Sequence, residues 1–579
     1  MINTEIARLF ERIADLLELS GENPFRVNSY RQGARAVEGL SEDLGVLVDE
    51  NRLESVKGIG KSLAQHIREY IAEGRIPLLD QLRERVPPGL PKLLDIPGMG
   101  PKKVIKVHEE LGVTDIEGLK AAIADGRLEQ LAGFGKTSAK KIADGIAFLE
   151  SSGTRTPLGV ALPIAESLAA QVGAIAGVKR VEIAGSLRRG EETIGDVDIL
   201  CEAADGERVV GAFVALPGVR RVLASGATKG SVTVGLAEDR ELQVDLRVVP
   251  RESFGAALQY FTGSKAHNVR LREMAGKKKW KLNEYGLFDA KDKALAGEEE
   301  EEIYKALGLP WVPPPLRQDR DEFEGKIDFD DLLQLSDIRA DLHMHTIASD
   351  GRNTIEEMAA AAKALGYHTI AICDHSKSSV IANGLTVERM KKHLKDIRAA
   401  AKRVEGVRIL AGCECDILPD GSLDYPDDLL AECDWVVASI HLAQGRGGTG
   451  KLSATERTLA AIENRWVSCI GHPTGRLINR REAMDVDMPA VVAAAAKTHT
   501  CLEINAAWQR LDLKADHVRM ALAAGVTLSI NTDAHSTQDF LQMRYGVLTA
   551  QRGAARKRDV INAMTPAGLL KRVSGKRGG

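Results

Sequence analysis

The sequence predicts a multidomain chain in which a helical amino-terminal region precedes an α+β unit with a mixed sheet and a carboxyl-terminal α/β barrel. Three observations lead to this prediction. The 579 residues exceed what one hydrophobic core supports. Apolar residues near the amino terminus follow helical spacing. Residues 336–579 repeat short apolar strands that end in polar residues, with amphipathic helices between them.

Composition limits the classes of protein that fit. The formal net charge is −4, so any DNA contact must come from local basic patches and backbone amides. Seven cysteines without C-x-x-C spacing indicate reduced thiols. The sequence shows no signal-peptide segment and no apolar run of membrane length. We therefore expect a cytoplasmic protein without membrane contact.

Helices are expected first, and three short glycine motifs lie among them. Each motif has two glycines around one apolar residue, followed by lysine: Gly58, Gly60 and Lys61; Gly98, Gly100 and Lys102; Gly133, Gly135 and Lys136. Such glycines permit a tight turn whose amides, at a helix amino terminus, point towards phosphate. A simple turn between helices would look the same, but three copies with lysines favour sequence-independent binding of the DNA backbone.

Paired aspartates identify the next unit. Asp196 and Asp198 alternate with apolar residues, so a strand places both carboxylates on one face, and Asp245 lies on another alternating segment. Two solvated surface aspartates would give the same D-x-D pattern. Three carboxylates together need a cation, and their oxygens suit Mg²⁺ or Mn²⁺. Just upstream, a glycine-flanked turn carries Arg188 and Arg189, which could share a phosphate with backbone amides.

These residues resemble the family X DNA polymerases, the nucleotidyltransferases that include DNA polymerase beta. The resemblance implies a palm in which Asp196, Asp198 and Asp245 are catalytic and hold two metal ions. It also implies a nucleotide site made of Gly185, Ser186, Arg189, Gly195, Tyr260, Phe261, Gly263, Asn268 and Arg272. At the amino terminus it places Arg26, Tyr30 and Arg31 on the positions that hold the 5′ phosphate of a gap. A basic helix face in water is the alternative for those three.

The sequence departs from that family at two positions. His66 stands where the polymerase beta lineage has the lysine of a deoxyribose-phosphate lyase, and an imidazole cannot form the required imine. We therefore expect no such lyase activity, or a weak one from another lysine. Ile194 stands where relatives often have a serine that bonds the triphosphate, which predicts weaker nucleotide binding.

The carboxyl-terminal strands end in residues that bind metals. Nine of them are expected to form a ring at the mouth of a parallel barrel: His343, His345, Asp350, His375, Glu414, His441, His472, Asp533 and His535. A single buried histidine is usually a core residue, but six in register are not expected by chance. Nine ligands imply two or three ions, and the mixture of imidazole and carboxylate suits Zn²⁺, Mn²⁺ or Fe²⁺. Cys413 and Cys415 would face away from Glu414.

This half resembles the PHP (polymerase and histidinol phosphatase) family, a distorted (β/α)₇ barrel of phosphoesterases. In bacterial family X polymerases this pairing implies a metal-dependent 3′→5′ exonuclease, with 3′-end or abasic-site processing. Arg446 and Arg476 are interpreted either as phosphate contacts near the mouth or as surface charges.

The leading hypothesis is a DNA-directed DNA polymerase for gap-filling repair, acting on DNA and dNTPs, with a second site in the barrel. The expected divisions are a DNA-end-binding domain, a second helix-hairpin-helix subdomain, a palm, a nucleotide-selecting subdomain, a linker and the barrel, at 1–80, 81–153, 154–250, 251–317, 318–335 and 336–579. The first alternative is a phosphoesterase whose nucleotidyltransferase half only presents DNA. The second is a non-catalytic scaffold for DNA ends.

Overall fold

The computed structural model describes residues 2–38, 44–56, 58–96, 99–152, 155–236, 240–441 and 452–575. The chain divides into two compact units. Unit 1 consists of Met1–Thr154 with Asn479–Arg481, and unit 2 of Arg155–Ile478 with Glu482–Gly579. Within the described ranges, no helix combines the length and apolar character that crossing a membrane requires.

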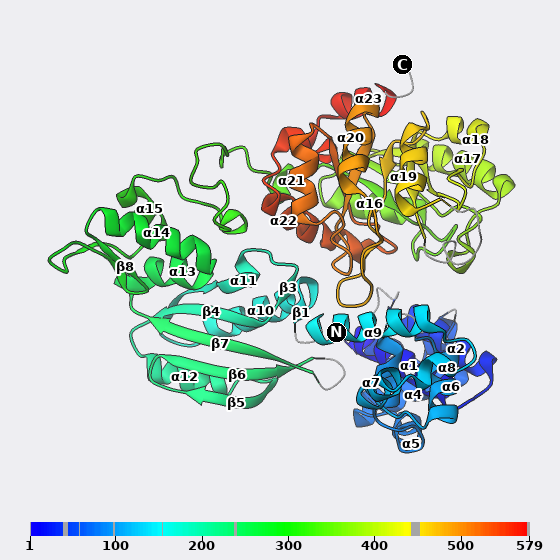
Figure 1. Cartoon of the computed structure of the whole chain (residues 1–579), viewed down its shortest axis with the longest axis horizontal. Coiled ribbons are helices and arrows are strands. Elements are labelled where there is room, and N and C mark those ends of the chain that lie inside the picture. Colours follow the sequence, from blue (N-terminus) through cyan, green and yellow to red (C-terminus); the bar gives the residue numbers. More distant parts are fainter. Residues whose placement is uncertain are drawn as a thin grey trace. The chain divides into compact units, whose positions relative to one another are not determined.

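Unit 1 is helical in its described residues (Figure 1). The apolar residues that repeat at helical spacing, among them Ile6, Phe10 and Ile13, are buried in one continuous core. Its helices are α1 (Ile2–Leu19), α2 (Pro24–Glu38), α3 (Leu44–Asp49), α4 (Lys61–Glu73), α5 (Pro77–Arg85), α6 (Pro101–Leu111), α7 (Ile116–Ala124), α8 (Arg127–Gln130) and α9 (Lys136–Ser152), with 3₁₀ turns at Leu53–Ser55 and Leu90–Asp95. The predicted helical region is confirmed.

Unit 2 begins with a five-stranded sheet in the order β2-β4-β7-β6-β5. Its strands are β2 (Val178–Ile183), β4 (Asp196–Ala203), β5 (Val219–Ser225), β6 (Lys229–Gly235) and β7 (Glu241–Val249). Only the central pair β4 and β7 is parallel; the other neighbours are antiparallel, so the predicted mixed sheet is confirmed. The associated short elements are α10 (Leu158–Gly173), α11 (Gly185–Arg188), α12 (Gly206–Val214) and the two-residue pair β1 (Thr156–Pro157) and β3 (Thr193–Ile194).

The next segment packs three helices with a small antiparallel sheet. Its elements are α13 (Phe254–Thr262), α14 (Lys265–Lys277), β8 (Lys281–Asn283), β9 (Gly286–Phe288), β10 (Ala294–Ala296) and α15 (Glu300–Leu307), with 3₁₀ turns at Arg251–Ser253 and Pro314–Leu316. Residues 318–334 then contain turns and one isolated bridge but no helix or strand. Glu322 in this segment is nevertheless buried and bonds His267 at 3.0 Å, so the segment is attached to α14.

The last part is a ring of seven parallel strands in sequence order. The strands are β11 (Ala340–Met344), β12 (Thr369–Ile372), β13 (Arg408–Asp416), β14 (Trp435–Ser439), β15 (Cys469–Ile470), β16 (Cys501–Asn505) and β17 (Leu528–Asn531). Contacts between β11 and β17, and a parallel bridge from Met344 to Ala534, bring the first and last strands side by side. The ring is therefore nearly closed, which confirms the predicted (β/α)₇ barrel.

Helices surround the barrel as the alternation of patterns predicted. They are α16 (Ile355–Ala364), α17 (Val387–Arg403), α18 (Asp427–Glu432), α19 (Ala454–Glu463), α20 (Met488–Thr498), α21 (Ala515–Ala523), α22 (Met543–Arg552) and α23 (Pro566–Gly575). Strands β12 and β14 are largely apolar and buried along their whole length, as parallel strands covered by helices must be. All seven cysteines are buried thiols outside any disulfide, and Cys413 and Cys415 belong to the apolar core.

A buried ionic cluster joins α11 to α15. Glu300 is 3% exposed and accepts hydrogen bonds from Arg188 at 2.9 and 3.1 Å and from Arg317 at 2.6 Å. The indole of Trp311 donates a further bond at 2.8 Å. Arg188, expected beside a phosphate, is thus occupied by a structural ion pair. Although burial raises the pKa of Glu300, Arg317 and Arg188 lower it to about 2.

We predict that Glu300→Ala lowers the free energy of unfolding by about 3–5 kcal/mol, because Arg317 is left as an unpaired buried charge. Glu300 has a depressed pKa in the folded state, so its contribution is present above its ordinary pKa of 4.5 and is lost as pH falls towards 2. The wild-type chain should therefore lose more stability over that interval than the variant does. Denaturant titrations followed by tryptophan fluorescence at several pH values measure both effects.

Glu301→Ala is the matched control, since this neighbouring carboxylate is exposed. Equal destabilisation by the two variants would show that the cluster does not stabilise the fold.

Candidate functional sites

The glycine motifs of unit 1 form turns at the starts of helices. Gly60, Gly100 and Gly135 directly precede α4, α6 and α9. Lys61, Lys102 and Lys136 are exposed at these helix starts, where amide groups face outwards. Gly58 and Gly133 have positive φ, while the candidate Gly98 lies outside the described residues. The described motifs thus have the geometry expected for phosphate contact.

The candidates at the 5′-phosphate position differ in accessibility. Arg26 is half-exposed and pairs with Glu22 at 3.2 Å. Arg31 contacts the carboxylates of Asp15 and Glu18. Tyr30 is only 3% exposed, in the core of unit 1.

His66 stacks on Tyr30 with ring centroids 6.0 Å apart. Its Nδ1 lies 2.8 Å from Glu69. The position that carries the lyase lysine in relatives therefore holds a half-buried imidazole paired with a carboxylate.

In the sheet of unit 2 the three predicted acids lie on the two parallel strands. Asp198 on β4 stands directly opposite Asp245 on β7, and Asp196 is two residues earlier on the same face of β4. Burial, together with the charges of Asp196 and Asp245, raises the pKa of Asp198 to about 7. Lys229 Nζ lies 2.7 Å from Asp245 Oδ2, and Ser231 donates to Oδ1 at 2.8 Å. The site therefore concentrates negative charge that one lysine only partly balances.

Around these acids lies the predicted nucleotide turn. Gly185 has φ +66° and begins α11, where any Cβ would collide with the carboxylate of Asp198. Ser186 and Arg189 are half-buried, and Gly195 is exposed at the start of β4. Arg189 Nε is buried without a hydrogen bond, while its Nη1 donates to the Thr262 carbonyl at 2.6 Å. Ile194 is fully buried in the core beside these residues, so it serves packing.

The candidates of α13 and α14 lie near the same turn. Tyr260 and Phe261 make an edge-to-face pair 5.3 Å apart, and Arg247 lies over the ring of Phe261. Asn268 is buried; its Oδ1 accepts a hydrogen bond from Gln259 Nε2 at 2.6 Å, and its Nδ2 donates to the Tyr260 carbonyl at 2.7 Å. Two predicted nucleotide-site residues remain. A Cβ on Gly263 would lie 3.2 Å from Nη1 of Arg189, and Arg272 is exposed.

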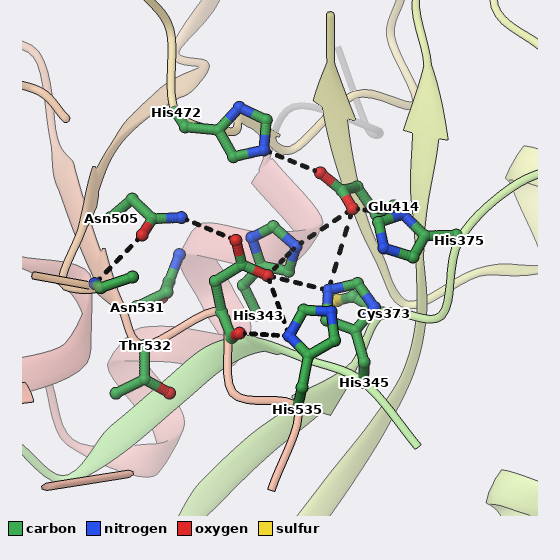
Figure 2. A network of polar contacts seen from close by, with 12 residues as sticks. His343, His345, Cys373, His375, Glu414, His472, Asn505, Asn531, Thr532 and His535 are labelled. Atoms are coloured by element: carbon green, nitrogen blue, oxygen red, sulfur yellow. Dashed lines mark hydrogen bonds and ion pairs between the residues drawn. The ribbon is translucent and has the colours of Figure 1, made fainter. Parts of the chain in front are cut away.

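At the barrel mouth the nine predicted ligands come together. Figure 2 shows His343, His345, His375 and His472 turned towards Glu414, at 3.6, 3.8, 2.8 and 3.2 Å from its oxygens. His441 lies 3.6 Å from the same carboxylate. Asp533 lies 2.9 Å from His345, and Asp350 lies 3.6 Å from His375 and 3.4 Å from His535. The six imidazoles therefore converge, as the register of the strand ends predicted.

These side chains form overlapping groups of the size that holds an ion. Ligand atoms lie within 4.8 Å of each other in His345, Asp350, His375 and His535; in His343, His345 and Glu414; and in His375, Glu414 and His441. Nε2 of His343 is buried, makes no hydrogen bond and lies 3.6 Å from Glu414 and 3.7 Å from Asp533. Two ligands on one ion of zinc size are about 3.4 Å apart, so the donor set fits metal binding.

At the barrel mouth the carboxylates lie among imidazoles that can balance their negative charge, more closely than Lys229 balances the three aspartates of the palm sheet. Burial raises the pKa of Glu414, but His375, His441 and His343 hold it well below its ordinary value. Burial lowers the pKa of His343, but Glu503, Asp533 and Glu414 hold it well above its ordinary value. The structure thus favours ionised carboxylates within a ring of imidazoles.

Sequence reasoning missed a second layer of residues behind this ring. Glu503 accepts from His343 Nδ1 at 2.8 Å and from the His472 amide at 2.6 Å, and Asp416 bonds Nδ1 of His441. Carboxylates on the far nitrogen of a ligating imidazole fix its orientation. Asp416 lies on β13 two residues after the predicted ligand Glu414, and Glu503 lies on the short apolar strand β16. Those strand patterns are the signal that could have identified them.

Arg510 was also missed, and no motif marks it. Its Nε lies 3.9 Å from Asp533, and its Nη1 is buried without a hydrogen bond. A guanidinium nitrogen without a hydrogen bond, beside the candidate metal ligands, suits an anionic group of a substrate. Arg476 instead pairs with Glu192, at 2.8 and 2.6 Å, while Arg446 lies outside the described residues.

Family models match four segments of the chain. A helix-hairpin-helix domain matches residues 1–76, and a SAM-like helix-hairpin-helix tandem matches residues 90–147. The DNA polymerase beta thumb matches residues 257–318, and the PHP domain matches residues 341–507.

Curated relatives match the whole chain or its parts. The DNA polymerase/3′-5′ exonuclease PolX of Bacillus subtilis (strain 168) is 41% identical over 564 residues, which are 97% of this chain and 98% of the relative. DNA polymerase lambda of Arabidopsis thaliana is 26% identical over 350 residues, 55% of this chain and 62% of the relative. A probable phosphatase of Caldicellulosiruptor saccharolyticus is 30% identical over 209 residues, 35% of this chain and 82% of the relative.

We predict that Glu414→Gln lowers the metal content of the protein more than His441→Ala does. Glu414 belongs to two of the three ion-sized groups, and His441 to one. Elemental analysis of protein purified without chelator measures the stoichiometry. Cys413→Ala is the control, since this thiol lies in the apolar core. Equal losses from Cys413→Ala and Glu414→Gln would contradict the assignment.

Proposed function

The chain belongs to the PolX family of DNA polymerase/3′-5′ exonucleases, and from this membership we propose that it fills short gaps during DNA repair, including base excision repair. It adds nucleotides at the sheet of unit 2 and processes 3′ ends, or abasic sites, at the barrel. The alternative of a phosphoesterase that only presents DNA fits less well, because the similarity to a polymerase/exonuclease extends over both halves of the chain.

One observation carries the proposal: a single chain holds two separate acid-rich centres. Asp198 and Asp245 stand on neighbouring strands beside the glycine turn, and Glu414 stands within the ring of histidines. The first is the arrangement that phosphoryl transfer to a primer requires, and the second suits hydrolysis of a phosphodiester.

At the polymerase centre each residue has a separate task. Asp196, Asp198 and Asp245 would hold two Mg²⁺ or Mn²⁺ ions, and Asp245 would help to activate the primer 3′ hydroxyl. Bound ions would supply positive charge against the triphosphate and would acidify that hydroxyl. Ser186, Arg189 and the Gly195 amide bind the triphosphate, and the unpartnered Nε of Arg189 supports this role. Tyr260 and Phe261 pack against the sugar, Gly263 permits close approach, Asn268 meets the base and Arg272 meets the template.

At the barrel, the nine side chains named above would hold two or three Mn²⁺, Zn²⁺ or Fe²⁺ ions, which supply Lewis acidity at the phosphodiester. Glu503 and Asp416 keep His343 and His441 in place, and Arg510 binds a phosphate of the DNA strand. The hairpins of unit 1 hold the DNA backbone with Lys61, Lys102 and Lys136, and Arg26 and Arg31 meet the 5′ phosphate. The protein acts as a monomer in the bacterial cytoplasm, at the nucleoid.

We predict that Asp196→Ala lowers primer extension by on the order of a thousandfold and leaves 3′→5′ degradation unchanged. His343→Ala should do the reverse, since the two centres share no residue. The measurement is extension and degradation of the same gapped DNA, with and without dNTPs, for both variants. Loss of both activities in either single variant, or no nucleotide addition by the wild type with Mg²⁺ or Mn²⁺, would refute the assignment.

We also predict no deoxyribose-phosphate lyase activity at the position of His66. Borohydride treatment of the chain on a 5′ abasic phosphate end should trap no adduct, because an imidazole cannot form the imine. His66→Lys is the informative comparison, since it restores an amine at that position. Trapping by the wild-type chain that one lysine substitution abolishes would contradict this prediction.

A further inference from the structure

The turn at residues 189–192 connects α11 to β3 and then to β4, the strand that carries Asp196 and Asp198. Side chains of the barrel contact this turn at several neighbouring residues. Arg552, at the end of α22, donates from Nη1 to the carbonyl of Arg189 at 3.1 Å and pairs with Glu191 at 2.7 Å. Gly190 has φ +65°, and a Cβ there would lie 3.1 Å from Leu548 of the same helix. The turn therefore fits closely against α22.

A second arginine holds the end of the turn. Arg476 makes a two-pronged pair with Glu192, at 2.8 and 2.6 Å, and also bonds the carbonyl of Leu511. The side chains of Arg476 and Glu192 are only 14% and 28% exposed. A partly desolvated bidentate pair fixes geometry better than an exposed one.

This turn connects two parts of the polymerase centre. At one end, Arg189 reaches the Thr262 carbonyl at 2.6 Å beside α13. At the other end, the Glu192 carbonyl accepts from the Leu158 amide at 3.0 Å, and β3 leads directly to Gly195 and Asp196. Displacing the turn would move the side chain and the amide that bind the triphosphate.

The barrel side of this contact is itself fixed. Asp512 Oδ2 accepts from the amides of Thr474 and Gly475 at 2.9 and 2.8 Å, and the Asn505 amide donates to the Asp512 carbonyl at 2.6 Å. One apolar cluster joins the barrel to the sheet, since it contains Leu511 and Tyr545 from the barrel and Val197 and Val244 from the sheet. The arginines therefore project from a packed surface.

We propose that Arg552 and Arg476 are positioning residues of the polymerase, so that the barrel, besides its own hydrolytic role, sets the geometry of the nucleotide-binding turn. This inference rests on the proposed role of Arg189 and Gly195. It assigns the barrel a function in dNTP affinity that does not involve its metal ions.

The test uses the full chain on a one-nucleotide gap. Arg552→Ala and Arg476→Ala should raise the KM for dNTP on the order of tenfold, because each removes charge-assisted contacts that hold the turn. The kcat and the KM for DNA should change far less, and 3′→5′ degradation should be unchanged. A residue with only a structural role would instead lower the melting temperature, the kcat and the 3′→5′ degradation together.

Arg544→Ala is the matched control. Arg544 also lies on α22 and also pairs with the sheet region, through Glu166 at 2.9 and 3.1 Å, but it does not contact the turn. Glu192→Gln provides a second variant that keeps the size of the side chain and removes its charge. The proposal is overturned if the KM for dNTP in Arg552→Ala, Arg476→Ala and Glu192→Gln stays equal to that of Arg544→Ala.

Arg189→Ala separates this inference from the proposed function. If it leaves the KM for dNTP unchanged, the assignment of the triphosphate site is wrong. If it raises that KM while the three turn variants do not, the site stands and the positioning role is refuted.

Discussion

Both centres depend on the burial of charged groups close to one another. At the sheet, burial and the neighbouring acids raise the pKa of Asp198 to about 7, and Lys229 pairs with Asp245. At the barrel, Glu414 is surrounded by imidazoles that hold its pKa low. Carboxylates alone suit hard ions that prefer oxygen, whereas the imidazole ring suits borderline transition metals. The donor chemistry therefore differs between the two centres.

The strands of the two sheets position these charged groups, and contacts with residues on other strands and turns then restrain them. Parallel strands place the ligands of the barrel at one mouth, and the parallel pair β4 and β7 places Asp198 opposite Asp245. Glu503 orients His343 from β16, and Gly185 leaves the space that Asp198 occupies. Catalytic side chains held in this way lose little entropy when substrate binds.

Local sequence patterns predicted the strands on which the candidate residues lie, because apolar runs identify these strands directly in the sequence. Alternation around Asp196 and Asp245, and the repeated strand ends from His343 to His535, were sufficient for the fold and for the convergence of the histidines. The contacts that the sequence did not indicate are long-range. Arg476 and Glu192 are 284 residues apart, and Arg188 pairs with Glu300 rather than with a phosphate. The spacing of apolar residues predicts local secondary structure and does not indicate which arginine pairs with which carboxylate between two domains.

The close fit between α22 and the turn at Gly190 limits how this architecture can be recombined. Leu548 and Arg552 face the sheet while the same helix packs on β16 and β17 of the barrel. A chimaera that joined the sheet of one relative to the barrel of another would retain both catalytic centres, yet the turn and the helix would come from different parents. Such exchanges, in the laboratory or in evolution, should succeed only when residues 189–192 and α22 are inherited together.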